Sequence, residues 1–213
     1  MNKYIVLDFE MCMVPRDMKE FPYSSEIIEI GAVALEESLK ITDSFKCYVT
    51  PQYGRLNPYI ETLTGITSKH LNGAPTIHEA IESFFNWIPE NSIFVSWSDS
   101  DKYQLQKELE LKGISIPGTD DYFDSWIDCQ KIFSEKMDTD KAYRLSEALI
   151  IADIDYDENL HDGLSDAENT AKLFAKMKKE KTLKLSSYYT KEEDSFLSCQ
   201  PFADLFKKLG TVV

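Results

Sequence analysis

The stretch YIVLDFE, residues 4–10, begins as a hydrophobic strand and ends in two carboxylates. Because side chains alternate between the two faces of a strand, Asp8 and Glu10 are expected on one face, about 7 Å apart along the chain, with Phe9 on the other. Two acids on one face can share a divalent cation. The alternative is a strand that ends at Leu7 and leaves Asp8 in a solvated loop. Partners elsewhere in the chain must decide between the two interpretations.

The composition is that of one main domain. The chain has 213 residues, of which 43% are hydrophobic, so it can bury a sizeable core. No segment approaches the length of a membrane span and no signal peptide precedes the first strand, so a cytoplasmic location and no membrane partner are expected. The four cysteines form no C-x-x-C pair, which argues against a zinc knuckle. The net charge of −14 argues against a protein that coats long duplexes and favours short substrates.

The rest of the chain alternates between strand and helix patterns. Residues 26–35 and 41–49 are predicted strands, and their short link favours an antiparallel pair. Gly31, inside the first of them, indicates a close backbone approach, with the first strand as the candidate partner. Further strands are predicted at residues 92–97 and 122–127, and helices at residues 76–88, 103–112, 128–137, 141–151 and around 171–177.

Polar groups recur at two later junctions. Asp99 and Asp101 follow the strand at residues 92–97 and precede a helix, where one of them can serve merely as a helix cap. His161 and Asp166 stand five apart at a loop-to-helix junction, a spacing that is also common without chemistry. Together with the acids of the first strand, these groups can converge on one face of an α/β sheet.

The ordered motifs LDFE (7–10), EIIEIGAV (26–33), LTGI (63–66), APT (74–76), SW (96–97) with the following Asp101, and HDGLSDA (161–167) resemble the DnaQ-like exonucleases of the DEDDh class. Within that class the resemblance is to the branch of KapD-type proteins and enhanced-RNAi 3′ exoribonucleases. It covers roughly residues 3–178. It implies an α/β, ribonuclease-H-like, three-layer fold: a mixed five-stranded sheet, with three antiparallel N-terminal strands and then parallel strands, flanked by helices.

The resemblance also implies a site. Two Mg²⁺ or Mn²⁺ ions are expected, since oxygen ligands suit these ions better than zinc. The histidine would accept the proton of the attacking water. Asp99 stays an alternative to Asp101. The implied metal ligands are Asp8, Glu10, Asp101 and Asp166, the implied general base is His161, and the expected contacts to the terminal nucleotide are Phe9, Met11, Leu63, Thr64 and Ile66.

The chain departs from the family pattern beside the proposed base. Asp162 follows His161 where many relatives carry a basic or polar residue, and this acid is expected to raise the pKa of the histidine or to weaken phosphate approach. Cys12 stands where the family often carries threonine, which puts one substrate contact in question.

The predicted function is hydrolysis of single-stranded RNA or DNA from the 3′ end, short oligonucleotides included, with release of nucleoside 5′-monophosphates by a two-metal-ion mechanism. One alternative is a non-catalytic adaptor of the same fold that binds a protein partner, and another is an enzyme for dinucleotides. The sequence does not separate RNA from DNA. Residues 1–178 are the predicted exonuclease domain. Residues 179–213 are a predicted extension whose short amphipathic helix, around residues 202–209, docks on the domain or binds a partner.

Overall fold

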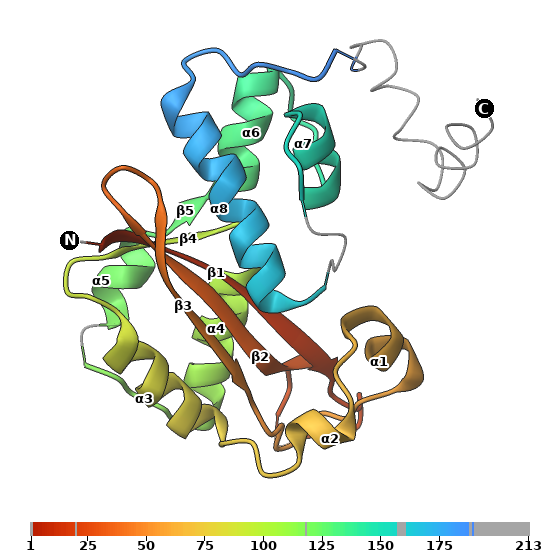
Figure 1. Ribbon diagram of the computed structural model, residues 1–213. Helices are drawn as coiled ribbons and strands as arrows, with labels where there is room; N and C mark the ends of the chain where they lie inside the picture. Colours follow the sequence, from red (N-terminus) through yellow and green to blue (C-terminus); the bar gives the residue numbers. More distant parts are fainter. Residues whose placement is uncertain (1, 20, 118, 157–160, 188, 190–213) are drawn as a thin grey trace.

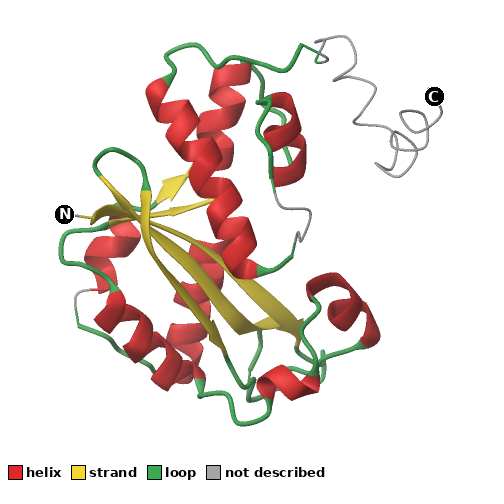
Figure 2. Cartoon of the chain, in the orientation of Figure 1, coloured by secondary structure: helices red, strands yellow, loops and turns green. Residues whose placement is uncertain are grey.

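A central sheet with helices on both faces organises the protein (Figures 1 and 2). The computed structural model describes residues 2–19, 21–117, 119–156, 161–187 and 189. The strand order is β3-β2-β1-β4-β5. β1 (Asn2–Met13), β2 (Ser25–Glu36) and β3 (Ile41–Tyr48) are antiparallel neighbours, while β4 (Ile93–Ser96) and β5 (Ile127–Asp128) continue the sheet in parallel with β1. The predicted mixed five-stranded sheet is confirmed.

The alternation of side chains along β1 supplies both hydrophobic cores. Ile5, Leu7 and Phe9 pack under α3 (Ile77–Trp87), α4 (Ser100–Lys112) and α5 (Thr119–Asp124). Tyr4 and Val6 face the opposite layer, which consists of α6 (Cys129–Met137), α7 (Leu145–Ile151) and α8 (Gly163–Lys179). β1 is therefore buried on both faces, as a central strand of an α/β sheet is expected to be.

Two short helices lie beyond the carboxyl end of β1. α1 (Pro58–Thr64) and α2 (Ser68–Leu71) cover a third, smaller hydrophobic cluster that contains Cys12 and Ile66 (Figure 1). The side chain of Asn57 caps α1 by accepting a hydrogen bond of 3.0 Å from the backbone N–H of Ile60. Tyr59 and Leu63 of α1 form one side of the space above the last residues of β1.

The close backbone approach predicted at Gly31 exists, but its partner is α8 rather than β1. A Cβ atom added to Gly31 would lie 2.0 Å from the carbonyl carbon of Gly163. A Cβ atom on Gly163 would in turn lie 3.1 Å from the carbonyl oxygen of Asp8. Two residues without side chains therefore let the first turn of α8 lie directly on β1 and β2.

Two predicted elements differ from the structure. Residues 122–127 were predicted as a strand, but most of this stretch belongs to α5 or to the turn after it, and β5 contains only Ile127 and Asp128. Its aromatic residues favour strands intrinsically, whereas here Tyr122 and Trp126 pack on Phe94, with ring centroids 4.6 and 5.1 Å apart. The helix predicted at residues 141–151 begins only at Leu145.

Other predictions concern thiols, membranes and the end of the chain. Cys12 and Cys129 are buried free thiols, and Cys47 is partly buried. No described helix is long and apolar enough to cross a membrane. The amphipathic helix predicted around residues 202–209 lies outside the described residues, so its docking stays a prediction.

Candidate active site

The first two carboxylates of the site belong to β1 itself. β1 continues to Met13, so the alternative in which Asp8 begins a loop is wrong. Asp8 lies opposite Gly31 and Glu10 opposite Glu29 in the antiparallel pair with β2, and the register shifts directly after Glu10. Such a bulge redirects side chains at the end of a strand pair. Glu10 is buried and Asp8 half-buried.

α4 adds the third carboxylate. Asp101 lies in the first turn of this helix, is 5% exposed, and accepts a hydrogen bond of 3.1 Å from the backbone N–H of Phe9. Asp99 makes no capping hydrogen bond and instead accepts one of 2.7 Å from Lys131 Nζ on α6. Of the two candidate aspartates, the structure therefore brings Asp101 to β1.

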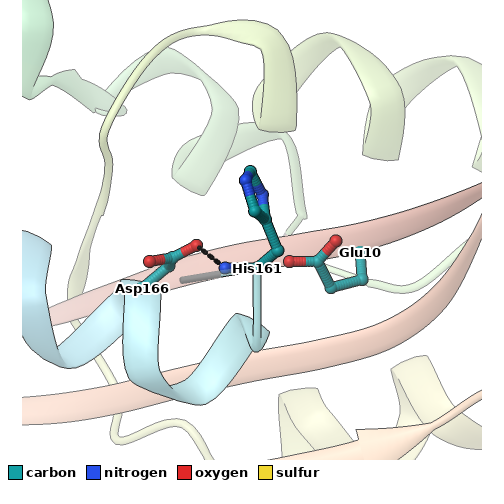
Figure 3. A group of neighbouring side chains, drawn as sticks. All are labelled: Glu10, His161 and Asp166. Carbon is teal, nitrogen blue, oxygen red and sulfur yellow. Dashed lines mark hydrogen bonds between the residues drawn. The ribbon is translucent and has the colours of Figure 1, made fainter. Parts of the chain in front are cut away.

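The start of α8 completes the cluster (Figure 3). Asp166 lies in the first turn of α8, and one of its oxygens, Oδ2, accepts a hydrogen bond of 2.9 Å from the backbone N–H of His161. One ligand atom each of Glu10, His161 and Asp166 lies within 4.8 Å of the other two. Figure 3 shows the carboxylates of Glu10 and Asp166 on either side of the His161 backbone. The Oδ1 atom of Asp166 is buried and has no hydrogen-bond partner among the described residues.

The electrostatics of the cluster are unfavourable in the absence of a cation. Burial, followed by repulsion from Asp166 and other neighbouring carboxylates, raises the pKa of Glu10 to about 8. Burial also raises the pKa of Asp101 to about 7, against the opposing effect of the hydrogen bond from Phe9. The pKa of Asp8 is raised by burial and then by Asp101 and Asp166. Buried acids with raised pKa values in a cleft are typical of functional sites.

The donor set fits divalent metal ions. It offers four carboxylates, of which Asp166 keeps an unpartnered oxygen, and a divalent cation would remove the repulsion that raises their pKa values. Oxygen-rich sites of this kind suit Mg²⁺ or Mn²⁺. Asp8, Glu10, Asp101 and Asp166 are the residues that would hold such ions, and all four line the same cavity.

These side chains line a cavity of about 790 Å³. Phe9, Met11 and Leu63 also line it, although the side chain of Phe9 is 3% exposed and belongs to the core beneath the sheet. The structure does not bring the other two expected nucleotide contacts to the cavity. The hydroxyl of Thr64 donates a hydrogen bond of 2.9 Å back to Ile60, and Ile66 is 1% exposed in the small third core.

Other residues of the cavity wall were not found from the sequence. Tyr59 of α1 stands on one side and is 70% exposed. Trp97, directly after β4, donates from Nε1 to the carbonyl oxygen of Tyr143 at 3.1 Å, and Gln130 donates to the same oxygen at 2.7 Å. Arg144 is the lone arginine or lysine among the described residues that line the cavity. The position of Trp97 at the end of a predicted strand was a usable signal, whereas the sequence of the loop before α7 gave no signal for Tyr143 or Arg144.

The fold and the clustered acids define a nuclease-type site, and comparison with known proteins identifies the class. The family model described as Exonuclease matches residues 5–174, so the chain belongs to the exonuclease family. This confirms the resemblance drawn from the sequence motifs.

Relatives within the family share about a quarter to a third of their aligned residues with the chain. The 3′-5′ exonuclease Snipper of Drosophila melanogaster is 29% identical over 195 residues, covering 81% of this chain and 68% of that protein. ERI1 exoribonuclease 3 of Homo sapiens is 28% identical over 182 residues, covering 80% of this chain and 52% of that protein. The chain thus spans about two thirds of the first relative and about half of the second.

Solved structures agree with the fold. The nuclease domain of 3′hExo, a DEDDh family member bound to rAMP, superposes with a TM-score of 0.73 at 23% identity and covers 86% of this chain and 96% of that domain. Pop2p of S. pombe in its Mg²⁺- and Mn²⁺-bound form superposes with a TM-score of 0.64 at 17% identity and covers 84% of each chain.

Proposed function

We propose that this protein is a divalent-metal-dependent 3′ to 5′ exonuclease that hydrolyses single-stranded RNA or DNA, short oligonucleotides included, and releases nucleoside 5′-monophosphates. One observation carries the proposal: carboxylates from β1, α4 and α8 meet a histidine at a single cavity, and no lysine of the described chain lines that cavity. Hydrolysis of a phosphodiester needs an activated water and a stabilised leaving oxygen.

The residues divide this work. When bound, two Mg²⁺ or Mn²⁺ ions would supply Lewis-acid activation of the water and charge stabilisation of the leaving oxygen. Asp8, Glu10, Asp101 and Asp166 would hold the ions. His161 is exposed at the edge of the cavity and accepts the proton of the attacking water on its imidazole, because histidine is the side chain best suited to proton exchange near neutral pH. The backbone N–H of His161 is bonded to Asp166, which fixes the base beside the metal ligands.

The cavity supports a single-stranded 3′ end as the substrate. Leu63, Met11 and Tyr59 present apolar or aromatic surface on which a base can stack without regard to its identity. A volume of about 790 Å³ suits a nucleotide-sized ligand. The similarity to an rAMP-bound nuclease domain, and to a structure bound to Mg²⁺ and Mn²⁺, supports both the ligand class and the ions.

A non-catalytic adaptor is the weaker candidate, because such a protein has no need to keep four mutually repelling acids together. Binding of a protein partner through the C-terminal helix and a cytoplasmic location stay predictions from the sequence. The choice between RNA and DNA depends on contacts to the 2′-hydroxyl.

The direct test uses 5′-labelled RNA and DNA strands, from dinucleotides to longer oligonucleotides, with Mg²⁺, Mn²⁺ or excess EDTA. We expect stepwise shortening from the 3′ end, nucleoside 5′-monophosphate products, and no reaction in EDTA. Asp166→Asn, purified in parallel, controls for contaminating nucleases. Cleavage that persists in EDTA, or equal cleavage by the Asp166→Asn protein, would contradict the proposal.

A further inference from the structure

A fifth carboxylate adjoins the metal-ligand cluster without belonging to the predicted set. Glu29 lies on β2 directly opposite Glu10, so both side chains point to the same face of the sheet. It is fully buried, and neither of its carboxylate oxygens has a hydrogen-bond partner among the described residues. A buried carboxylate in this condition needs a compensating charge close by.

Lys46 supplies that charge from the edge strand β3. Its Nζ atom lies 3.4 Å from Oε1 of Glu29 and donates a hydrogen bond to Oδ2 of Asp162, the residue that precedes α8. The same Nζ atom lies 5.4 Å from the centre of the Tyr48 ring. One side chain thus connects β3, β2 and the start of α8. Because the lysine and Asp162 remain 27% and 36% exposed, the pair adds little to fold stability by itself.

Asp162 connects this lysine to the segment that carries His161 and Asp166. Its side chain caps α8 by accepting a hydrogen bond of 3.0 Å from the backbone N–H of Ser165. Its backbone oxygen accepts the N–H of Asp166 at 2.9 Å. The preceding residue, His161, has a φ of 70°, a left-handed conformation that costs energy for a residue other than glycine and must be held by its surroundings. A shift of Asp162 would therefore displace both His161 and Asp166.

The first turn of α8 packs directly on the sheet, so its position decides where His161 and Asp166 lie. Gly31 and Gly163 put the backbone of α8 in direct contact with the sheet, without room for a Cβ atom at Gly31 and with the Glu29 carboxylate beside Gly163. The anchors of the turn are instead polar: the bond between His161 and Asp166 on one side, and the bond between Asp162 and Lys46 on the other. The acid that was expected to act on the pKa of His161 is thus bonded to a lysine.

We propose that Lys46 is a positioning residue, which holds Asp162 and thereby fixes His161 and Asp166 over the carboxylates of β1. This inference rests on the proposed exonuclease activity. Direct contact between Lys46 and a substrate phosphate is the alternative, and it requires the lysine to leave both acids that hold it.

The kinetic test compares Lys46→Met, Lys46→Arg, Asp162→Asn and the Lys46→Met/Asp162→Asn double variant at saturating Mn²⁺. We expect Lys46→Met to lower kcat by about tenfold to a hundredfold, because a misplaced catalytic group loses about that much, with KM nearly unchanged. Lys46→Arg should recover most of the rate, and the double variant should be no slower than the slower single variant. Lys107→Met, which removes an exposed lysine paired with Glu110 on α4, is the matched control and should match wild type.

The structural test does not depend on activity. In EDTA, the amide hydrogens of residues 161–167 should exchange faster with solvent in Lys46→Met than in wild type, whereas exchange in β1 should be unchanged. This arm remains decisive if the wild-type protein shows no nuclease activity. A raised KM at constant kcat would assign Lys46 to the substrate instead. Additive losses in the double variant, failure of Lys46→Arg to recover activity, or unchanged exchange would each overturn the positioning role.

Discussion

Two groups of buried acids lie beside the same strand, β2, and they differ in how their negative charge is compensated. In the first, which we call the paired network, Glu26 and Glu108 are fully buried and both contact Lys112, whose Nζ atom lies 2.5 Å from Glu26 Oε1 and 2.8 Å from Glu108 Oε1. Backbone N–H groups complete it: Gln52, Tyr53 and Gly54 donate to Glu26, and Ile27 donates to Glu108. The second group, which we call the catalytic cluster, consists of Asp8, Glu10, Asp101 and Asp166.

The pKa values express the difference at Glu26, whereas burial still raises the pKa of Glu108 in the paired network. Burial acts to raise the pKa of Glu26, but Lys112 and the backbone donors outweigh it and lower the value. In the catalytic cluster, burial and repulsion act in the same direction, and the pKa of Glu10 rises to about 8. Both groups are buried and acidic, so burial and charge alone do not mark the site. What distinguishes the catalytic cluster is that no described lysine or arginine forms an ion pair with its acids, and that the backbone donors of Phe9 and His161 do not offset their burial and mutual repulsion.

The largest expected effect comes from removing one acid of the catalytic cluster. Asp8→Asn should lower kcat/KM by about 10³-fold or more, since several kcal/mol of transition-state stabilisation depend on a metal ligand. The metal-free variant should unfold at the same or a higher temperature than wild type, because a repelling charge has gone. Single-turnover assays and thermal unfolding in EDTA measure the two quantities. A strong loss of stability would mean that Asp8 belongs, like the paired network, to the support of the fold.

The converse variant removes the cation of the paired network. Lys112→Met should destabilise the protein by about 3 to 5 kcal/mol, because it leaves two buried carboxylates uncompensated. Its activity should stay near that of wild type at temperatures where it remains folded. Urea titration gives the free energy of unfolding, and Lys107→Met, which breaks an exposed ion pair, is the control expected to cost less than about 1 kcal/mol. If Lys112→Met lost no more free energy of unfolding than Lys107→Met, Lys112 would not be what stabilises the two buried carboxylates.

Two aspartates at the start of α4, Asp99 just before the helix and Asp101 in its first turn, sharpen the comparison further. Asp101→Asn should lower the rate by about 10²-fold, while Asp99→Asn, whose partner is the exposed Lys131, should change it less than about threefold. The asparagine at position 101 can still accept the hydrogen bond from Phe9, so the fold should persist. Rates from the same oligonucleotide assay, with unfolding temperatures beside them, decide the order. The reverse order would place the metal ligand two residues earlier.

The smallest expected effect is a dependence of stability on pH. The pKa of Glu10 is raised in the folded protein, so the folded state binds more protons than the unfolded state between the ordinary value of 4.5 and about 8. Stability of the metal-free protein should therefore fall as pH rises through this window, and Mn²⁺ should stabilise the protein more at pH 8 than at pH 5. Thermal scans with and without EDTA measure this. Glu10→Gln should weaken the dependence, and an unchanged slope in that variant would refute the assignment to Glu10.

Much of the site could be predicted because its signals are local. Alternation along β1 placed Asp8 and Glu10 on one face. The order of the motifs singled out Asp101, His161 and Asp166, which the structure brings to the same cavity. Local patterns do not report which side chains meet across the fold. Thr64 and Ile66 were assigned to the cavity because they follow Leu63 in one motif, yet they point into α1 and the small core.

The sequence by itself determined the class of fold, the residue types proposed for the site and the bounds of α3 and α6 to within one residue, because strand alternation and capping act over a few residues. Only the tertiary structure decided that Gly31 packs against Gly163 and that Glu29 lies opposite Glu10. It also decided that Lys46 contacts Asp162, 116 positions away in the chain. These contacts join segments far apart in sequence, and they depend on how strands and helices pack. Packing of this kind also places a lysine between two buried acids of one group, whereas no described lysine forms an ion pair with the acids of the other group.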